Sequence, residues 1–328
     1  MDEKEMKSQI KGFQQIIEQV RKEAARAVVG QQAAVRSFIR GIISNGNILV
    51  EGVPGIAKTL IVRTLSVVMG CEFKRIQFTP DLLPTDIIGI STYEKERGFY
   101  VLKGPIFSNF ILGDEINRAP PKVQSALLEG MQEKQVTIGK ETFPLPKPFF
   151  VLATQNPIEQ LGTFPLPEAQ LDRFLFKINV GYPTIEEEQE VLERNMSLHK
   201  FEDFNLAPLL NPDKIIAMQK LVQSIYLDKK IEMYIVKIVD ATRYPKKYGL
   251  RMAKYCGWGA SPRASIGLFI ASKAEALLRG DTFVTPAHVK TVAPDILRHR
   301  LVVNYEGQSE GIGPDDLINE ILTKIPVP

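Results

Sequence analysis

A glycine-bearing loop followed by a lysine and a hydroxyl residue is the segment best suited to bind phosphate. The spacing G-x-x-x-x-G-K-[ST] holds from Gly52 to Thr59, except that Ala57 stands at the last glycine position. Backbone N–H groups of such a loop and the positive end of the next helix surround a β-phosphate. Lys58 would place its charge on the β- and γ-phosphates, and the Thr59 hydroxyl would ligate Mg²⁺. The loop predicts a nucleoside triphosphate site, with an ordinary strand–turn–helix corner as the alternative.

Two apolar segments further along the chain end in polar side chains. Phe110–Asp114 is followed by Glu115, and 151–155 by Asn156. The carboxyl ends of strands are where open α/β sheets bind ligands. Asp114 suits the hydration shell of Mg²⁺, Glu115 suits a base that orients attacking water, and Asn156 could hold that water and sense the γ-phosphate. The alternatives are a solvated strand end for the two acids and a common Asn-Pro turn for the amide.

Two arginines stand where a nearby anion would account for them. Arg263 lies just inside a helix that Ser261 and Pro262 begin, and a cation at that end opposes the helix dipole. Arg173 follows the loop 161–167 and precedes an apolar segment. Phosphate is the natural candidate for the anion, and a surface salt bridge is the alternative for each arginine.

Apolar strands and helical patterns alternate over the first half of the chain. Strands are expected at Ile48–Glu51, Phe73–Phe78, Phe110–Asp114, Phe149–Thr154 and Phe174–Ile178, and helices at Lys7–Ala27, Gln31–Ile43, Thr59–Met69, Pro120–Gln132 and Glu168–Asp172. Strands that are apolar throughout and separated by helices predict a mostly parallel sheet covered on both faces. Two hairpins are expected within Ile88–Leu102 and Gln135–Leu145.

Beyond Gly181 the pattern predicts helices alone. They are expected at Thr184–His199, Asn211–Ile225, Lys230–Thr242, Pro262–Gly280 and from Pro286 onward. We therefore place a boundary near Gly181, with an N-terminal helix and an α/β nucleotide-binding domain over 1–181 and a helical domain over 182–328.

Bulk composition is that of an ordinary globular protein. The 328 residues are 44% hydrophobic and 24% charged, and the net charge of +3 is too small to argue for nucleic acid or an anionic membrane. The two cysteines and the three scattered histidines, His199, His288 and His299, offer no metal cluster. Neither a signal peptide nor a membrane-spanning run is visible, which predicts a cytoplasmic setting.

Long strings around these residues resemble the AAA+ ATPases, and the MoxR family in particular, over almost the whole chain. The strings are Phe78–Pro84, Gly113–Lys122, Ala126–Gln132, Ala153–Ile158, Pro165–Phe174 and Ala260–Ala264. Ala57 then looks like a family trait, whereas Gly113 stands where alanine is more usual. The Tyr- and Lys-rich stretch Tyr244–Trp258 looks longer than in the shortest family members, and we interpret it as a packed lid loop.

The resemblance implies a role for each candidate position. Gly52–Thr59 matches the Walker A loop, Asp114 and Glu115 the Walker B pair, and Asn156 sensor 1. Arg263 matches sensor 2, and Arg173 matches the arginine finger that reaches a neighbouring subunit's nucleotide. The implied nucleotide-binding residues are Val29 and Gly30 beside the adenine, with Gly52, Val53, Pro54, Gly55, Ile56, Ala57, Lys58, Thr59 and Leu60 around the phosphates; the hairpins look like the helix-2 insert and the hairpin before sensor 1.

The resemblance also implies an activity and partners. It implies an AAA+ P-loop core with a helical lid that hydrolyses ATP with Mg²⁺, held by Thr59 and by Asp114 through water. The implied assembly is a homo-hexameric ring that remodels or matures a protein client, which in this family often has a von Willebrand factor A-type domain. A helicase-related nucleic-acid motor, a magnesium-chelatase-like metal-insertion subunit and a nucleotide-gated scaffold with little turnover are the alternatives.

Overall fold

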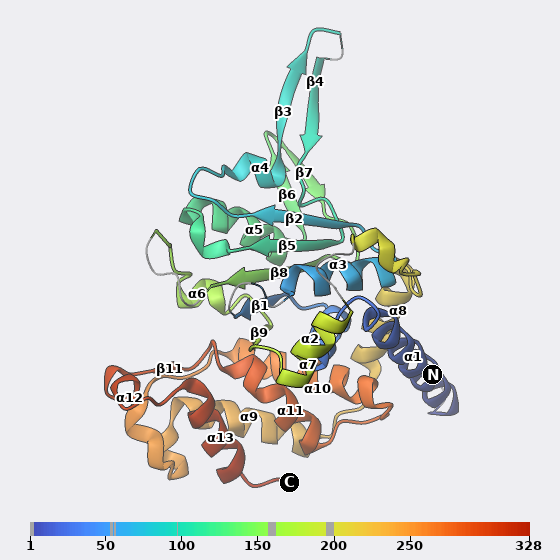
Figure 1. Ribbon diagram of the computed structural model, residues 1–328. Coiled ribbons are helices and arrows are strands. Elements are labelled where there is room, and N and C mark those ends of the chain that lie inside the picture. The colour runs from blue at the N-terminus through green and yellow to red at the C-terminus, as the bar shows by residue number, and fades with distance from the viewer. Residues whose placement is uncertain (1–2, 53–54, 56, 97, 157–161, 195–199) are drawn as a thin grey trace. The chain divides into compact units, whose positions relative to one another are not determined.

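The computed structural model describes residues 3–52, 55, 57–96, 98–156, 162–194 and 200–328 (Figure 1). The chain divides into two compact units. The core unit comprises Glu18–Pro167 and Ile178–Ala217, and the lid unit comprises Met1–Ile17, Glu168–Lys177 and Met218–Pro328. The division into independent domains at 1–181 and 182–328 stays a prediction.

A five-stranded sheet in the order β2-β5-β8-β1-β9 organises the core unit. Its strands are β1 (Ile48–Glu51), β2 (Phe73–Gln77), β5 (Phe110–Asp114), β8 (Phe150–Gln155) and β9 (Phe176–Asn179). The pairs β2–β5, β5–β8 and β8–β1 are all parallel. The predicted α/β fold with a mostly parallel sheet is therefore confirmed.

The sequence of the central strands explains both the sheet and the location of its polar edge. All residues of β1, β5 and β8 are buried except the last residue of each, which is half-buried. Helices α2 (Gln32–Ile43), α3 (Lys58–Val68) and α5 (Pro121–Glu133) supply further buried apolar side chains. Polar side chains consequently collect at the carboxyl edge, where parallel strands all end.

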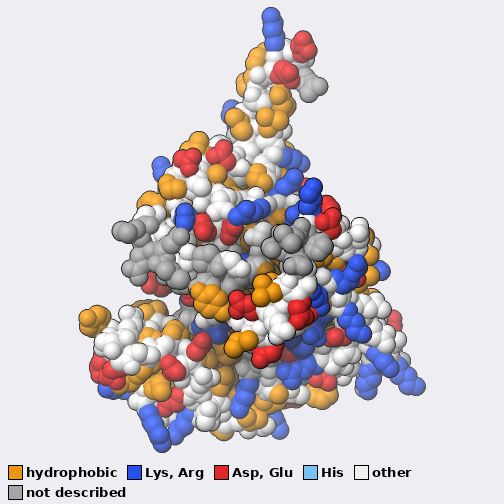
Figure 2. Space-filling view, viewed as in Figure 1, with side chains coloured by type: hydrophobic (Ala, Val, Ile, Leu, Met, Phe, Trp, Pro, Cys, Tyr) orange, Lys and Arg blue, Asp and Glu red, His pale blue; other side chains and the backbone are white. Residues whose placement is uncertain are grey.

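The two predicted hairpins are present beside the sheet. One is formed by β3 (Gly89–Glu94) and β4 (Gly98–Lys103), and the other by β6 (Gln135–Ile138) and β7 (Glu141–Pro144). The β3–β4 ribbon extends well beyond the sheet (Figure 1) and carries apolar side chains along its length (Figure 2). Among them, Tyr93 and Phe99 are exposed, and the centroids of their rings lie 5.1 Å apart.

Two glycines allow the close backbone approach at the base of this ribbon. A Cβ added at Gly89, whose φ is 100°, would lie 2.1 Å from the Leu102 carbonyl oxygen. A Cβ at Gly104 would lie 2.2 Å from the Ile87 carbonyl oxygen. Both obstacles are backbone atoms, so side chains at these positions would separate the strands at their base.

The remaining elements are mostly helical, as predicted. They are α1 (Glu3–Ala24), α4 (Pro84–Ile88), α6 (Glu168–Leu171), α7 (Ile185–Glu193), α8 (Pro212–Ser224), α9 (Lys229–Arg243), α10 (Pro262–Arg279), α11 (Pro286–Leu297), α12 (Tyr305–Ser309) and α13 (Pro314–Lys324). Thr184 caps α7 as expected, since its hydroxyl accepts from the Glu187 N–H. The helix was expected to run to His199, but it ends at Glu193 with Arg194 as its C-cap; His199 itself lies outside the described residues.

Two details of the lid unit were not predicted. β10 (Cys256–Trp258) pairs with β11 (Val302–Val303) in an antiparallel ribbon within the region expected to be helical only. Strands of two or three residues are too short to show an alternating pattern. β9 also begins two residues later than expected, because the Phe174 and Leu175 carbonyls accept hydrogen bonds from Arg300.

Candidate functional site

The loop between β1 and α3 holds the Lys58 ammonium close to two carboxylates. Lys58 Nζ donates to the Gly52 carbonyl oxygen at 2.7 Å. Burial lowers the pKa of Lys58, while the charges of Asp114 and Glu115 act to raise it. The predicted positions Val53, Pro54 and Ile56 lie outside the described residues. The described part of the loop thus places a cation beside the carboxyl ends of the strands.

Ala57 adopts a left-handed conformation immediately before α3. Its φ and ψ are 60° and 19°, a region that glycine enters freely and that costs a residue with a Cβ about 1 kcal/mol. Ala57 is the one departure from the glycine-loop spacing in the sequence. The structure shows that it keeps the backbone conformation for which glycine is suited, at an energetic cost.

Asp114 makes hydrogen bonds through both carboxylate oxygens. The Thr154 hydroxyl donates to Oδ1 at 2.6 Å, and Arg75 donates to Oδ2 from Nη2 at 2.6 Å and from Nε at 3.1 Å. Arg75 is on β2 and Thr154 is on β8, the two strands that flank β5. The order of the sheet therefore determines the partners of this aspartate.

Glu115 lies in an unusual backbone conformation directly after β5. Its φ and ψ are 56° and 51°, and its N–H donates to the Thr154 hydroxyl at 2.8 Å. Oε2 accepts from Gln77 Nε2 at 3.0 Å and lies 2.9 Å from Arg118 Nε. A left-handed non-glycine residue is strained, and such strain is common at functional sites. The Thr154 hydroxyl therefore joins the backbone of Glu115 to the side chain of Asp114.

The other predicted positions of the core unit lie at strand and helix ends. Asn156 is buried and directly follows β8. Val29 is buried. Gly30 has a φ of 63°, and the next residue, Gln31, is also left-handed and caps the start of α2. A Cβ added at Gly30 would lie 2.5 Å from the Glu187 carboxyl carbon, so the backbone and α7 approach closely at this position.

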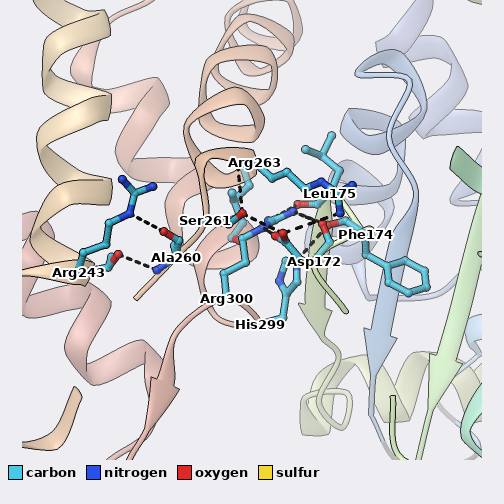
Figure 3. Close-up of polar contacts among 11 residues, drawn as sticks. Asp172, Phe174, Leu175, Arg243, Ala260, Ser261, Arg263, His299 and Arg300 are labelled. Atoms are coloured by element: carbon cyan, nitrogen blue, oxygen red, sulfur yellow. Dashed lines mark hydrogen bonds and ion pairs between the residues drawn. The ribbon is translucent and has the colours of Figure 1, made fainter. Parts of the chain in front are cut away.

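The two predicted arginines both belong to the lid unit. Arg173 is exposed in the turn between α6 and β9, and Arg263 lies in the first turn of α10. Arg263 Nη1 is 3.9 Å from Asp172 Oδ2, so the side chain of the residue before Arg173 lies near Arg263 (Figure 3). Residues 91 positions apart are thus neighbours within one unit.

Comparisons with known proteins agree with this geometry. The model of the ATPase family associated with various cellular activities (AAA) matches residues 47–176, and the AAA lid domain matches 250–321. Chaperone MoxR1 of Mycobacterium tuberculosis is 48% identical over 93% of this chain and 81% of its own. The chain belongs to the MoxR family of AAA+ ATPases. Protein MoxR of Methylorubrum extorquens is 31% identical over 94% of both chains.

A solved structure supports the same fold for this MoxR-family chain. The crystal structure of a proposed ATPase from Cytophaga hutchinsonii superposes with a TM-score of 0.92 at 46% identity, covering 99% of this chain and 98% of that one. The AAA+ core and the helical lid are therefore both established as parts of the fold.

The oxygen-bearing side chains at the site suit Mg²⁺ better than a transition metal. Among the described residues, no cluster of three or more His, Cys, Asp or Glu could hold a metal by itself. Mg²⁺ usually keeps several waters and takes one or two protein oxygens together with nucleotide phosphates. The Thr59 hydroxyl and the Asp114 carboxylate are ligands of that kind.

Three contributors to the site were not predicted from the sequence. Thr154, Gln77 and Arg75 contact the two acids but belong to strands distant from them in sequence. One signal was available, because Thr154 precedes Asn156 by two residues and alternation along a strand places both on one face. For the β2 side chains, only the strand register shows that Gln77 lies beside Asp114.

Proposed function

We propose that this MoxR-family chain hydrolyses ATP in an Mg²⁺-dependent reaction at the carboxyl edge of its sheet. One observation carries the proposal: the Thr154 hydroxyl holds both Asp114 and Glu115 in place. The two carboxylates are also close enough to Lys58 to affect its pKa. An ordinary solvated strand end does not require a buried hydroxyl that joins the carboxylate of one acidic residue to the backbone N–H of the next. Family membership supports the same reaction.

Each side chain of the core unit has a chemical task in this proposal. Lys58 neutralises charge on the β- and γ-phosphates, while backbone N–H groups at the start of α3 bind phosphate oxygens. Mg²⁺, when bound through Thr59 and the water shell of Asp114, would neutralise developing charge on the phosphates. Glu115 orients the attacking water and accepts its proton, and Asn156 holds that water. Val29 and Gly30 would lie beside the adenine.

The proposal assigns the lid arginines to two different nucleotides. Arg263 would contact the phosphates of its own chain, and Arg173 would reach those of a neighbouring subunit in a homo-hexameric ring. An arginine supplied by a neighbour can be worth about 10³–10⁵ in rate, so an isolated chain should turn over slowly. The work would be chaperone-like remodelling, maturation or metal-cofactor assembly of a protein client.

One finding bears on the client. The relative from Mycobacterium tuberculosis is named a chaperone, which supports a protein client for this chain as well. None of the described helices is long and apolar enough to cross a membrane. We propose that this chain acts in the cytoplasm on a protein client, and a client that contains a von Willebrand factor A-type domain is the first to test.

Substitution of Glu115 by glutamine tests the proposed hydrolysis. The Glu115→Gln protein should bind ATP normally but hydrolyse it about 10²–10⁴-fold more slowly, because an amide cannot accept the proton. Phosphate release measures turnover, and a fluorescent ATP analogue measures binding. Lys58→Ala is the matched control and should lose binding instead. Normal turnover by Glu115→Gln would remove this residue as the base.

A further inference from the structure

The Asp172 side chain joins the two lid segments that contain Arg173 and Arg263. Its Oδ2 accepts from the Ser261 hydroxyl at 2.8 Å, and that hydroxyl in turn accepts from the Arg263 N–H at 3.1 Å (Figure 3). Ser261 is the N-cap of α10, so the carboxylate contacts the residue that begins this helix. One side chain thus links the turn before β9 to the start of α10.

The Arg300 guanidinium fixes the backbone on both sides of Arg173. A guanidinium has five N–H donors, and all five are used here. Nε donates to Asp172 Oδ1 (2.6 Å), Nη2 to the carbonyls of Asp172 (3.2 Å) and Phe174 (2.6 Å), and Nη1 to those of Leu175 (3.1 Å) and Ile296 (2.5 Å). His299 Nε2 also lies 3.0 Å from the Phe174 carbonyl oxygen. Arg173 itself is left exposed.

Burial makes this arrangement persistent. The Arg300 side chain is 3% exposed, so solvent and salt screen its ion pair with Asp172 only weakly. Burial lowers the pKa of Arg300, and the hydrogen bond and charge of Asp172 oppose that shift. Separating the two charges would leave each one buried without a partner, which is costly because water cannot hydrate them. The carbonyls that flank Arg173 are therefore held in one conformation.

We propose that Asp172 is a positioning residue that sets the directions of Arg173 and Arg263 together, with Arg300 as its buried counter-ion. The inference rests on the proposed function, in which both arginines contact phosphate. It adds that an arginine acting on the neighbour's nucleotide and an arginine acting on the chain's own nucleotide share one support. A disturbance of that support changes both at once.

The first test replaces Asp172 by asparagine in the full-length protein. The amide keeps the size of the carboxylate but loses its charge and presents an N–H group to a donor. Turnover should fall about 10–100-fold, because small misplacements of charged groups cost that much, while binding of a fluorescent ATP analogue changes less than about 3-fold. Normal turnover by Asp172→Asn would overturn the proposal.

Asp240 provides a matched control in the same unit. Its carboxylate also accepts from one cation and one hydroxyl, Lys247 and Tyr248, and its exposure of 24% is close to the 19% of Asp172. Asp240→Asn should leave turnover within about 2-fold, since no proposed phosphate contact depends on it. A similar loss in both variants would mean a general lid effect and would overturn the positioning role.

A coupling measurement separates positioning from stability. In a chain that already carries Arg173→Ala and Arg263→Ala, adding Asp172→Asn should change the residual turnover by less than about 2-fold. An undiminished 10-fold loss in that background would show a merely structural role.

The Glu115→Gln protein, measured alongside, distinguishes the two proposals. Normal turnover by Glu115→Gln would contradict ATP hydrolysis at this site. Slow turnover by Glu115→Gln together with normal turnover by Asp172→Asn would contradict only the positioning role.

Discussion

Two aspartates, one in each unit, form ion pairs of the same length in opposite surroundings. Arg75 Nη2 lies 2.6 Å from Asp114 in the core unit, and Arg300 Nε lies 2.6 Å from Asp172 in the lid unit. The Arg75 side chain is 49% exposed, whereas that of Arg300 is 3% exposed. Water can replace the first arginine at little cost, but it cannot reach the second.

This difference matches what each carboxylate is proposed to do. Asp114 must exchange partners if a hydrated Mg²⁺ is to approach it, and an exposed guanidinium can move away. Asp172 must keep its partners if it supports two arginines, and a buried guanidinium with five acceptors stays in place. The two ion pairs have the same length but differ in the burial of the arginine. We infer that this burial, more than the distance, decides whether an ion pair can exchange partners.

Removal of the buried counter-ion should have the largest effect on stability. Arg300→Met removes the counter-ion and the donor to Asp172 Oδ1, together with the donors to four backbone carbonyls, which should reduce the free energy of unfolding by about 3–5 kcal/mol. Urea unfolding followed by circular dichroism measures this loss. A loss below about 1 kcal/mol would break the comparison.

Lys134 tests whether burial of a charged side chain affects stability as strongly in the core unit. Its ammonium donates to the Phe149 carbonyl oxygen at 3.3 Å, and burial lowers its pKa from 10.5 to about 8. Below pH 8 the lysine is protonated in both states, so folding bears the full cost of burying the charge. Between about 8 and 10.5 only the unfolded chain keeps the proton, so stability should rise with pH.

The Lys134→Met protein should lack that dependence. At pH 7 it should be about 1–3 kcal/mol more stable than the unsubstituted chain, and the difference should shrink as the pH rises towards 10.5. Urea unfolding followed by circular dichroism at several pH values measures both curves. Parallel curves would show that the ammonium is hydrated and that burial has less weight in this unit.

Arg75 should have the smallest effect on stability and a specific effect on metal dependence. Arg75→Gln should change the free energy of unfolding by less than about 1 kcal/mol, because the ion pair is solvent-exposed. It should also lower the half-saturating Mg²⁺ concentration for turnover by up to about 5-fold, since Asp114 loses a competing cation. Lys74→Gln, the exposed neighbour on β2, controls for a general change in charge.

The sequence predicted residues that follow one another in a motif better than those that meet across strands. Lys58, Asp114 and Glu115 lie at ends of apolar segments, and the structure brings their charges together as parallel strands require. Thr154 and Gln77 could not be found in the same way, because their contacts depend on which strands are neighbours. The order β2-β5-β8-β1-β9 is a property of the whole sheet.

The lid shows the same limit more strongly. Ser261 and Pro262 predicted the start of α10, which the structure confirms. Nothing near Asp172 in the sequence indicates Arg300, which lies 128 residues away and makes five hydrogen bonds to several segments. No pattern in the neighbouring sequence marks a buried arginine of this kind, because only the tertiary structure decides which acceptors its N–H groups reach.

The glycines at the base of the β3–β4 ribbon have a practical consequence for labelling the protein. Because Gly89 and Gly104 pack backbone against backbone, insertions or bulky substitutions there should disrupt the ribbon. Near the opposite end, a Cβ added at Gly98 would meet nothing within 4 Å. The φ of 72° at Gly98 still favours glycine, so fluorophores, crosslinkers or epitope tags are best attached at the exposed Lys95 nearby, where they leave the carboxyl edge of the sheet untouched.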